Sequence, residues 1–337
     1  TGRGPAALAP GNGVLAKPAE QTPLIAAEAG GALWAAGVPR HALQLLPGPG
    51  ASVGARLVAD GRVRGVLFTG STEVARLLQR ALVGRVDAQG RAIPLIAETG
   101  GQNAMIVDSS ALPEQVVADV LASAFDSAGQ RCSALRCLYV PEEAAVHLLD
   151  MLLGAMAELR VGNPERLATD VGPVIDAEAQ AGIEAHIEAL RARGRRVHQV
   201  ARPGEQPLAP GSFVLPTLIE IEHLGELTRE VFGPVLHVVR YRRDELDGLL
   251  AQVRATGYGL TLGLHTRIDE TIARVEAAAQ VGNLYVNRNM VGAVVGVQPF
   301  GGEGLSGTGP KAGGPLYLYR LLAQRPPGVL ARVMGQM

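Results

Sequence analysis

The feature that most constrains the fold is the alternation of short apolar segments with amphipathic segments over the first hundred residues. The strand-like segments are residues 14–16, 44–46, 65–68 and 94–97. The helix-like segments between them are residues 22–36, 51–59 and 71–82. Parallel strands need a crossover connection, and a helix is the usual one. The sequence therefore predicts an α/β fold whose parallel sheet is covered by helices on both faces, with ligands bound where the strands end.

A second α/β section begins near residue 102. Its strand-like segments are residues 103–107, 138–140, a part of 231–241, and 284–286. Its helix-like segments are residues 113–125, 144–159, 177–193 and 269–280. The segment at 113–125 carries one apolar stripe, as expected of a helix that packs on a sheet. The chain therefore divides into two successive α/β sections without an internal repeat.

Charge and composition exclude several classes of protein. Hydrophobic residues make up 47% of the chain and the net charge is −1, so neither nucleic acid nor an anionic membrane is an expected partner. No apolar run reaches the roughly 18 residues of a membrane span, and residues 1–13 do not resemble a signal peptide. Cys132 and Cys137 form neither a disulfide framework nor a usual zinc pair. We therefore expect a cytoplasmic protein without a metal site.

Cys132 is the first candidate catalytic residue. It follows a glycine-containing loop that leaves the helix expected at 113–125, and Arg131 precedes it. A neighbouring positive charge favours the thiolate, which is the nucleophilic form of cysteine. The alternative is a buried and unreactive cysteine, because free cysteine is among the residue types most often buried.

Two further candidates lie at the ends of expected strands. Glu98 ends the strand at 94–97 and precedes Gly100 and Gly101, at the edge where a carboxylate can meet a ligand. Ser71 opens a helix directly after a strand and Gly70, and the free N–H groups of a helix start favour a phosphate. The alternatives are an ordinary loop glutamate and a routine helix cap. A G-x-G-x-x-G dinucleotide fingerprint is missing.

Six motifs, taken in their order and spacing, resemble the aldehyde dehydrogenase superfamily. They are Lys17-Pro18-Ala19-Glu20, Phe68-Thr69-Gly70-Ser71, Glu98-Thr99-Gly100-Gly101, Gly129-Gln130-Arg131-Cys132, Glu230-Val231-Phe232-Gly233-Pro234 and Pro299-Phe300-Gly301-Gly302. Within the superfamily, residues 100–108, 130–136 and 304–320 are similar to the semialdehyde dehydrogenase domain of the bifunctional proline utilization A flavoenzymes. That domain oxidises glutamate 5-semialdehyde, the open form of pyrroline-5-carboxylate, to glutamate with NAD.

The resemblance implies a domain plan and a reaction. Residues 1–101 would form a Rossmann-type NAD-binding domain without its N-terminal part, residues 102–297 a catalytic cysteine domain, and residues 298–337 a C-terminal return segment. Cys132 would attack the aldehyde to form a thiohemiacetal, which becomes a thioester when hydride leaves. Glu98 would then activate the water that hydrolyses the thioester. Cys137 would be structural.

The resemblance also implies ligands for the cofactor and the substrate. The cofactor residues would be Lys17, Glu20, Phe68, Gly70, Ser71, Glu98, Gly100, Glu230 and Phe232. Among these, Lys17 and Glu20 would hold the adenosine ribose, so that the carboxylate repels a 2′-phosphate and NAD is preferred over NADP. The residues for a small aldehyde that bears a carboxylate would be Arg131, Ser133, Gly292, Ala293 and Phe300, although Phe300 is equally compatible with a plain core role.

The chain also departs from the family pattern. The asparagine that the family places in its oxyanion hole would precede Thr1, as would an N-terminal helical segment, and residues 1–10 carry Arg3-Gly4-Pro5 where an apolar helix is expected. The parent protein would be a homo-oligomer that carries a proline dehydrogenase domain with FAD. One alternative is an aldehyde dehydrogenase for another acid substrate, against which Ser133 argues together with Gly292 and Ala293. The other is a fragment that folds or binds NAD without turnover. The missing asparagine supports this alternative, because losing one oxyanion donor lowers the rate by about 10²–10³.

Overall fold

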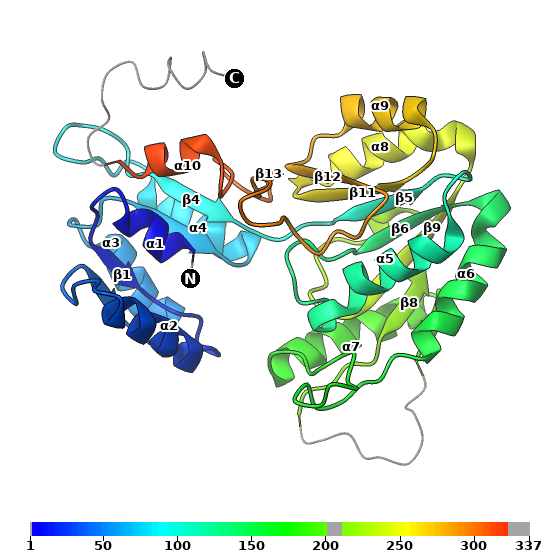
Figure 1. Cartoon of the computed structure of the whole chain (residues 1–337), viewed down its shortest axis with the longest axis horizontal. Helices are drawn as coiled ribbons and strands as arrows, with labels where there is room; N and C mark the ends of the chain where they lie inside the picture. Colours follow the sequence, from blue (N-terminus) through cyan, green and yellow to red (C-terminus); the bar gives the residue numbers. More distant parts are fainter. Residues whose placement is uncertain (1, 201–210, 323–337) are drawn as a thin grey trace. The chain divides into compact units, whose positions relative to one another are not determined.

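The computed structural model describes residues 2–200 and 211–322, which form parts of two compact units (Figure 1). The first unit comprises Thr1–Glu98, Val294–Phe300 and Thr308–Met337. The second comprises Thr99–Ala293 and Gly301–Gly307. The segment after residue 293 therefore contributes to both units.

The first unit contains two parallel strand pairs, each closed by a helical crossover. β1 (Val14–Ala16) pairs with β2 (Leu43–Leu45) through α2 (Pro23–Ala35), and β3 (Val66–Thr69) pairs with β4 (Leu95–Glu98) through α4 (Thr72–Leu82). The alternation of strands and helices is as predicted, but in the described residues no ladder joins β2 to β3. The expected single sheet is therefore two separate pairs. Segment spacing predicts strands and crossovers, but it does not determine which strands pair.

Short helices complete the first unit. They are the π-helical turn η1 (Gly50–Gly54), α3 (Ala55–Ala59), α1 (Arg3–Leu8) and α10 (Pro315–Arg320). Despite its glycine and proline, the segment of α1 is helical, because both residues lie in its first turn, where backbone N–H groups have no intrahelical partner. Arg3 donates to the carbonyl of Ile96 in β4 over 3.0 Å, which ties α1 to the β3–β4 pair.

The second unit is built on a seven-stranded mixed sheet. In their order across the sheet, the strands are β12 (Asn283–Val286), β11 (Thr261–His265), β5 (Ala104–Val107), β6 (Cys137–Pro141), β9 (Val235–Tyr241), β8 (Thr217–Glu220) and β7 (Arg196–Gln199). All neighbours are parallel except β7 and β8. Every residue of β5, β6 and β11 is buried, as expected of parallel strands with both faces covered.

The helices of the second unit pack around this sheet. They are α5 (Pro113–Phe125), α6 (Glu142–Ala157), α7 (Ala177–Ala192), α8 (Leu246–Ala255) and α9 (Asp269–Ala278). α5 and α6 pack on each other and on β9. α8 and α9 lie side by side (Figure 1), and Arg274 and Asp247 form an ion pair between them at 2.6 Å. A separate antiparallel pair joins β10 (Tyr258–Gly259) to β13 (Glu303–Gly304).

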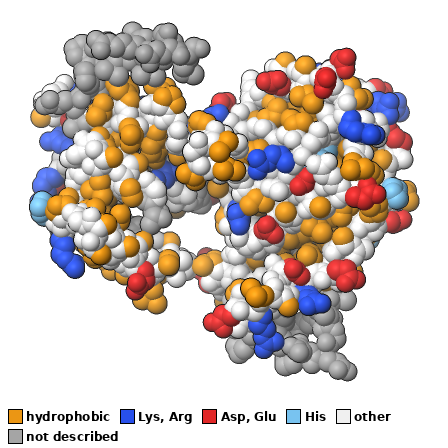
Figure 2. Space-filling model, viewed as in Figure 1, with side chains coloured by type: hydrophobic (Ala, Val, Ile, Leu, Met, Phe, Trp, Pro, Cys, Tyr) orange, Lys and Arg blue, Asp and Glu red, His pale blue; other side chains and the backbone are white. Residues whose placement is uncertain are grey.

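The surface of the second unit carries acidic and basic side chains close to one another (Figure 2). In the first unit, α2 leaves the apolar side chains of Leu24 and Ile25 exposed, at 81% and 69%. Among the described residues, no helix is long and apolar enough to cross a membrane.

Candidate active site

The loop that carries Cys132 connects α5 to β6 through a left-handed turn. Ser127, Ala128 and Gly129 have positive φ angles of 56°, 54° and 66°. A Cβ atom on Gly129 would lie 2.1 Å from the carbonyl oxygen of Gly233 and 2.9 Å from that of Ala124. Position 129 therefore requires glycine both for its backbone conformation and for the close approach of a second segment.

The backbone around Cys132 is held by a buried amide side chain. Asn103 Nδ2 donates to the carbonyl oxygens of Cys132 and Ala134 over 2.7 and 2.9 Å, and Asn103 Oδ1 accepts from the N–H of Thr261. The Cys132 residue itself is partly exposed. Its neighbour Ser133 is buried and donates from Oγ to the carbonyl of Val291 over 2.9 Å. The nucleophile candidate is therefore reachable on a loop whose backbone is fixed, and Asn103 is a residue that sequence reasoning missed.

Arg136 is a second missed residue, and it joins the Cys132 loop to Glu230. Its side chain is 1% exposed. Arg136 donates to the carbonyls of Gly129 and Arg131 over 2.7 and 3.0 Å. It also donates to Glu230 Oε1 from Nη2 and Nε, over 2.9 and 3.2 Å. An arginine within the otherwise apolar stretch 134–141 was the available signal, because buried arginines are rare unless paired.

The two glycines after Glu98 make room for the carboxylate of Glu230. Gly101 donates its N–H to Glu230 Oε2 over 3.2 Å. A Cβ atom on Gly100 would lie 1.6 Å from the same oxygen. The structure thus brings together Gly100 and Glu230, which the sequence placed in separate motifs.

In the first unit, the β3–β4 pair brings Glu98 and Ser71 to one strand-end edge. Glu98 is the last residue of β4 and stands opposite Thr69 of β3, and its carbonyl accepts from the N–H of Gly70 over 3.2 Å. Ser71 follows at the start of α4 and caps it, accepting from the N–H of Val74 over 3.2 Å. The cap is the routine interpretation of Ser71, and it still leaves the hydroxyl able to donate to a phosphate.

Lys17 and Glu20 both bond to the backbone of residues 48–50, at the corresponding edge of the β1–β2 pair. Lys17 Nζ donates to the carbonyls of Pro18 and Gly48 over 2.6 and 3.1 Å. Glu20 is exposed and its Oε1 accepts from the N–H of Gly50 over 2.6 Å. An ammonium and an accessible carboxylate on one loop fit a ribose diol, and the start of α4 fits a phosphate. The residues of this unit are therefore compatible with a dinucleotide.

The remaining predicted residues are more exposed or less tightly held. Arg131 is exposed and donates to Ser127 Oγ over 3.1 Å. Phe232 is 45% exposed, and the guanidinium of Arg136 lies 5.1 Å from its ring centroid. Phe68 is partly buried against Gly70. Gly292 and Ala293 belong to the second unit and are partly exposed, whereas Phe300 belongs to the first, where its backbone pairs with Ala312.

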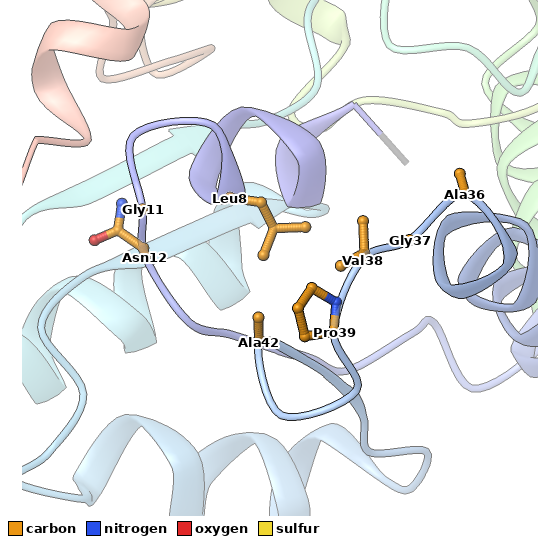
Figure 3. A pocket seen from close by; sticks show the side chains of 8 residues that line it. All are labelled: Leu8, Gly11, Asn12, Ala36, Gly37, Val38, Pro39 and Ala42. Carbon is orange, nitrogen blue, oxygen red and sulfur yellow. The ribbon is translucent and has the colours of Figure 1, made fainter.

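A hollow in the first unit lies apart from all predicted site residues (Figure 3). It has a volume of about 380 Å³ and is lined by Leu8, Gly11, Asn12, Ala36, Gly37, Val38, Pro39 and Ala42. The amide nitrogen of Asn12 is already bonded to the carbonyls of Ala7 and Leu321. Apart from Asn12, the side chains that line this hollow are apolar or absent, so it lacks the acid, base or nucleophile of a catalytic site.

Comparison with known families identifies the chain. The model of the aldehyde dehydrogenase family matches residues 2–325. The chain belongs to the aldehyde dehydrogenase family. The α/β fold that the resemblance implied is confirmed by solved structures. The crystal structure of a bifunctional proline utilization A (PutA) protein is 56% identical and superposes with a TM-score of 0.89, over 95% of this chain and 32% of that one. The 1-pyrroline-5-carboxylate dehydrogenase from Thermus with bound NAD is 36% identical, with a TM-score of 0.83, over 92% and 59%.

Curated relatives agree with these structures. The bifunctional protein PutA of Salmonella typhimurium is 71% identical over 333 residues, which are 98% of this chain and 25% of that protein. The 1-pyrroline-5-carboxylate dehydrogenase of Bacillus cereus is 38% identical over 317 residues, which are 93% and 60% of the two chains. The aldehyde dehydrogenase chain described here thus spans about a quarter of the length of its PutA relatives.

The two cysteines of this aldehyde dehydrogenase chain are expected to differ sharply in reactivity. Cys137 lies in β6 with none of its surface exposed, and burial raises the pKa of its thiol. Cys132 is partly exposed beside Arg131. Iodoacetamide at neutral pH should therefore alkylate Cys132 more than about 10-fold faster than Cys137, as mass spectrometry of peptides would show. The unfolded chain is the control, in which both should react alike; equal labelling of the folded chain would contradict the assignment.

A histidine pair, made of buried His237 and half-buried His186, is expected to make the stability of the fold pH-dependent. His237 Nδ1 donates to the carbonyl of Arg136 over 2.9 Å, which leaves His237 Nε2 to accept from His186 Nε2 at 2.9 Å. His237 must be neutral for this chain of bonds, because its Nε2 has to keep the lone pair that accepts. Burial lowers the pKa of both histidines, with Arg229 and Arg193 adding to the effect on His186.

Because the folded pKa values lie below the unfolded value of about 6.5, the unfolded state binds more protons in acid. The stability from this pair is complete above about pH 6.5 and is lost as the pH falls towards the folded pKa values. Lowering the pH from 7 to 5 should therefore reduce the unfolding free energy of the wild type by about 1–2 kcal/mol more than that of His237→Asn. Asparagine is chosen because its amide N–H can still donate to the carbonyl of Arg136. Urea unfolding at both pH values tests this. Identical losses in the two proteins would mean that His237 does not titrate as inferred.

Proposed function

We propose that this chain oxidises glutamate 5-semialdehyde, the open form of 1-pyrroline-5-carboxylate, to glutamate with NAD. The observation that carries the proposal is the partly exposed Cys132 on a loop whose carbonyl is fixed by Asn103. The extent of the similarity supports it, because relatives named 1-pyrroline-5-carboxylate dehydrogenase match 93% of the chain. The same similarity favours a working dehydrogenase over a non-catalytic fragment.

In the proposed reaction, the thiolate of Cys132 attacks the aldehyde carbon and forms a thiohemiacetal. The backbone N–H of Cys132 would donate to the oxygen that becomes negative. Bound NAD supplies the acceptor for the hydride that leaves the former aldehyde carbon. Glu98 then takes a proton from the water that attacks the resulting thioester, so that glutamate and the Cys132 thiol are released. Overall, aldehyde, water and NAD⁺ give acid, NADH and a proton.

Nine residues would hold the cofactor. Lys17 and Glu20 would bind the adenosine ribose, and Ser71 would meet the pyrophosphate at the start of α4. Glu230 would hold the nicotinamide ribose, oriented by Arg136 and by the N–H of Gly101. The other proposed cofactor contacts are Phe68, Gly70, Glu98, Gly100 and Phe232.

The substrate carboxylate would be bound by Ser133 and by the backbone of Gly292 and Ala293. Ser133 Oγ donates its single hydrogen to the carbonyl of Val291 in the structure, and on binding the hydroxyl would rotate to donate this hydrogen to the substrate carboxylate. Arg131 would add a positive charge, and Phe300 would contact the methylene groups. Residues that bind a carboxylate would favour the proposed substrate over aldehydes that lack an acid group.

The parent protein would be a cytoplasmic homo-oligomer whose other part is a proline dehydrogenase with FAD. The supporting observation is the length of the PutA relatives, of which the matched region is 25%. Cys132 and Cys137 are not joined in a disulfide, which suits a reducing compartment.

The test of the function is NADH formation from pyrroline-5-carboxylate, measured for this chain and for its full-length parent. We expect turnover with NAD and much slower turnover with an aldehyde of similar length that lacks the carboxylate. Preference for another acid aldehyde would indicate a different subclass. Tight NAD binding without any NADH formation, in the parent as well, would indicate a non-catalytic protein.

Cofactor choice gives a further prediction. Glu20→Ser should lower the preference for NAD over NADP by about 10-fold, because the repulsion between the carboxylate and a 2′-phosphate is removed. The value is modest because Glu20 is exposed and water screens its charge. Binding of both cofactors by titration calorimetry measures it, with Glu28→Ser on α2 as the control. Equal affinity of the wild type for NAD and NADP would show that Glu20 is misplaced.

A further inference from the structure

Arg136 carries a permanent charge into the core of the second unit. It lies directly before β6, and its side chain is 1% exposed. A charge at such a position is tolerated only when it is paired and hydrogen-bonded. Its ionic partner is Glu230, whose side chain is 14% exposed. The ion pair is therefore largely shielded from water. A change in its geometry should affect both the Cys132 loop and the segment at Glu230.

The guanidinium of Arg136 uses its fork to connect two segments. One side of the fork holds the Cys132 loop through the carbonyls of Gly129 and Arg131. The other side holds Glu230 Oε1 through two N–H groups, and Nη1 also approaches the carbonyl of Gly233 at 3.4 Å. Lysine cannot reproduce this arrangement, because its ammonium is a point charge without a planar fork.

The contacts of Glu230 fix the direction of its carboxylate. Glu230 Oε1 is bound by Arg136 and Oε2 by the N–H of Gly101. A carboxylate has about four acceptor positions, and Arg136 and Gly101 occupy three of them. The same guanidinium also lies over the ring of Phe232. Arg136 thus touches two proposed nicotinamide-side residues and the backbone on either side of Gln130, directly before Cys132.

We propose that Arg136 is a positioning residue that couples Glu230 to the Cys132 loop, so that binding of NAD changes the reactivity of the cysteine. The inference rests on the proposed function for the identity of the cofactor. Its physical basis is one rigid cation shared by the carboxylate that orients the cofactor and the loop that presents the thiol. A change in the direction or charge of Glu230 is thereby passed to the carbonyls of residues 129 and 131.

The experiment measures the alkylation rate of Cys132 by iodoacetamide, with and without NAD, for the full chain and its variants. In the wild type, NAD should change this rate. In Arg136→Lys, which retains the charge but loses the fork, the NAD effect should shrink by about 10-fold, together with a rise in the KM for NAD that exceeds any fall in kcat. Arg240→Lys is the matched control, because Arg240 makes a similar pair with Glu220 on an exposed face. This control should behave as the wild type.

Glu230→Gln tests the coupling from its other end. It removes the negative charge from Arg136 and should alter Cys132 alkylation in the absence of NAD, which makes this variant decisive even if Arg136→Lys does not fold. The double variant should show less than the summed effects of the two changes. An unchanged alkylation rate in Glu230→Gln without NAD, or a full NAD effect in folded Arg136→Lys, would overturn the proposal. Because alkylation needs no aldehyde, failure of the proposed substrate would leave this test interpretable.

Discussion

Glu98→Gln is expected to allow the first hydride transfer but to slow steady turnover by about 10²–10⁴-fold, the usual contribution of a general base. Glutamine keeps the shape of glutamate but cannot take a proton from water. Because Glu98 ends β4 and its backbone is fixed against Thr69 and Gly70, the substitution should leave the fold unchanged. The thioester on Cys132 would then accumulate.

Rapid mixing of the full-length enzyme with NAD and pyrroline-5-carboxylate measures this. A burst of NADH close to one per active site should precede slow turnover. Glu73→Gln, an exposed carboxylate in the first turn of α4, is the control and should turn over normally. Disappearance of the burst in Glu98→Gln would mean that Glu98 acts earlier, in activating Cys132.

Gly129→Ala is expected to lower the unfolding free energy by about 2–5 kcal/mol. The left-handed φ of 66° costs an alanine about 1–2 kcal/mol. The added methyl group would also overlap the carbonyl of Gly233 at 2.1 Å, and such overpacking typically costs about 1–3 kcal/mol. Since the displaced segment leads into Cys132, the alkylation rate of the thiol should change as well.

Urea unfolding of Gly129→Ala and of the matched variant Gly182→Ala tests this explanation. Gly182 lies within α7, and a Cβ atom there would have no neighbour within 4 Å. Alanine at that position should be stabilising by about 0.5–1 kcal/mol, because a helix interior disfavours glycine. A loss below about 1 kcal/mol in Gly129→Ala would show that the loop relaxes and does not require glycine.

The failed expectations show where sequence patterns lose information. β8 and β11 were missed, and so was the helix α8 between β9 and β11. β11 is short and wholly buried, and it contains Gly263, whose missing side chain leaves space for Met105 and Met290. Such a strand shows no alternation of apolar and polar residues, because neither of its faces meets water. The pairing of β1–β2 and β3–β4 as separate sheets was hidden for a different reason, since pairing depends on contacts between distant residues.

The sequence by itself determined the α/β class, the order of most helices and the membership of the aldehyde dehydrogenase family. Each of these depends on local periodicity or on short motifs. It also singled out Glu98 and Ser71, because in a parallel pair the position of a residue along its strand tells at which edge it lies. The tertiary structure alone decided what surrounds Cys132. The bond between Arg136 and Glu230 spans 94 residues, and that between Asn103 and Cys132 spans 29. These contacts exist because β5, β6 and β9 are neighbours in the sheet, and strand order is set by packing over the whole unit, which no local pattern records.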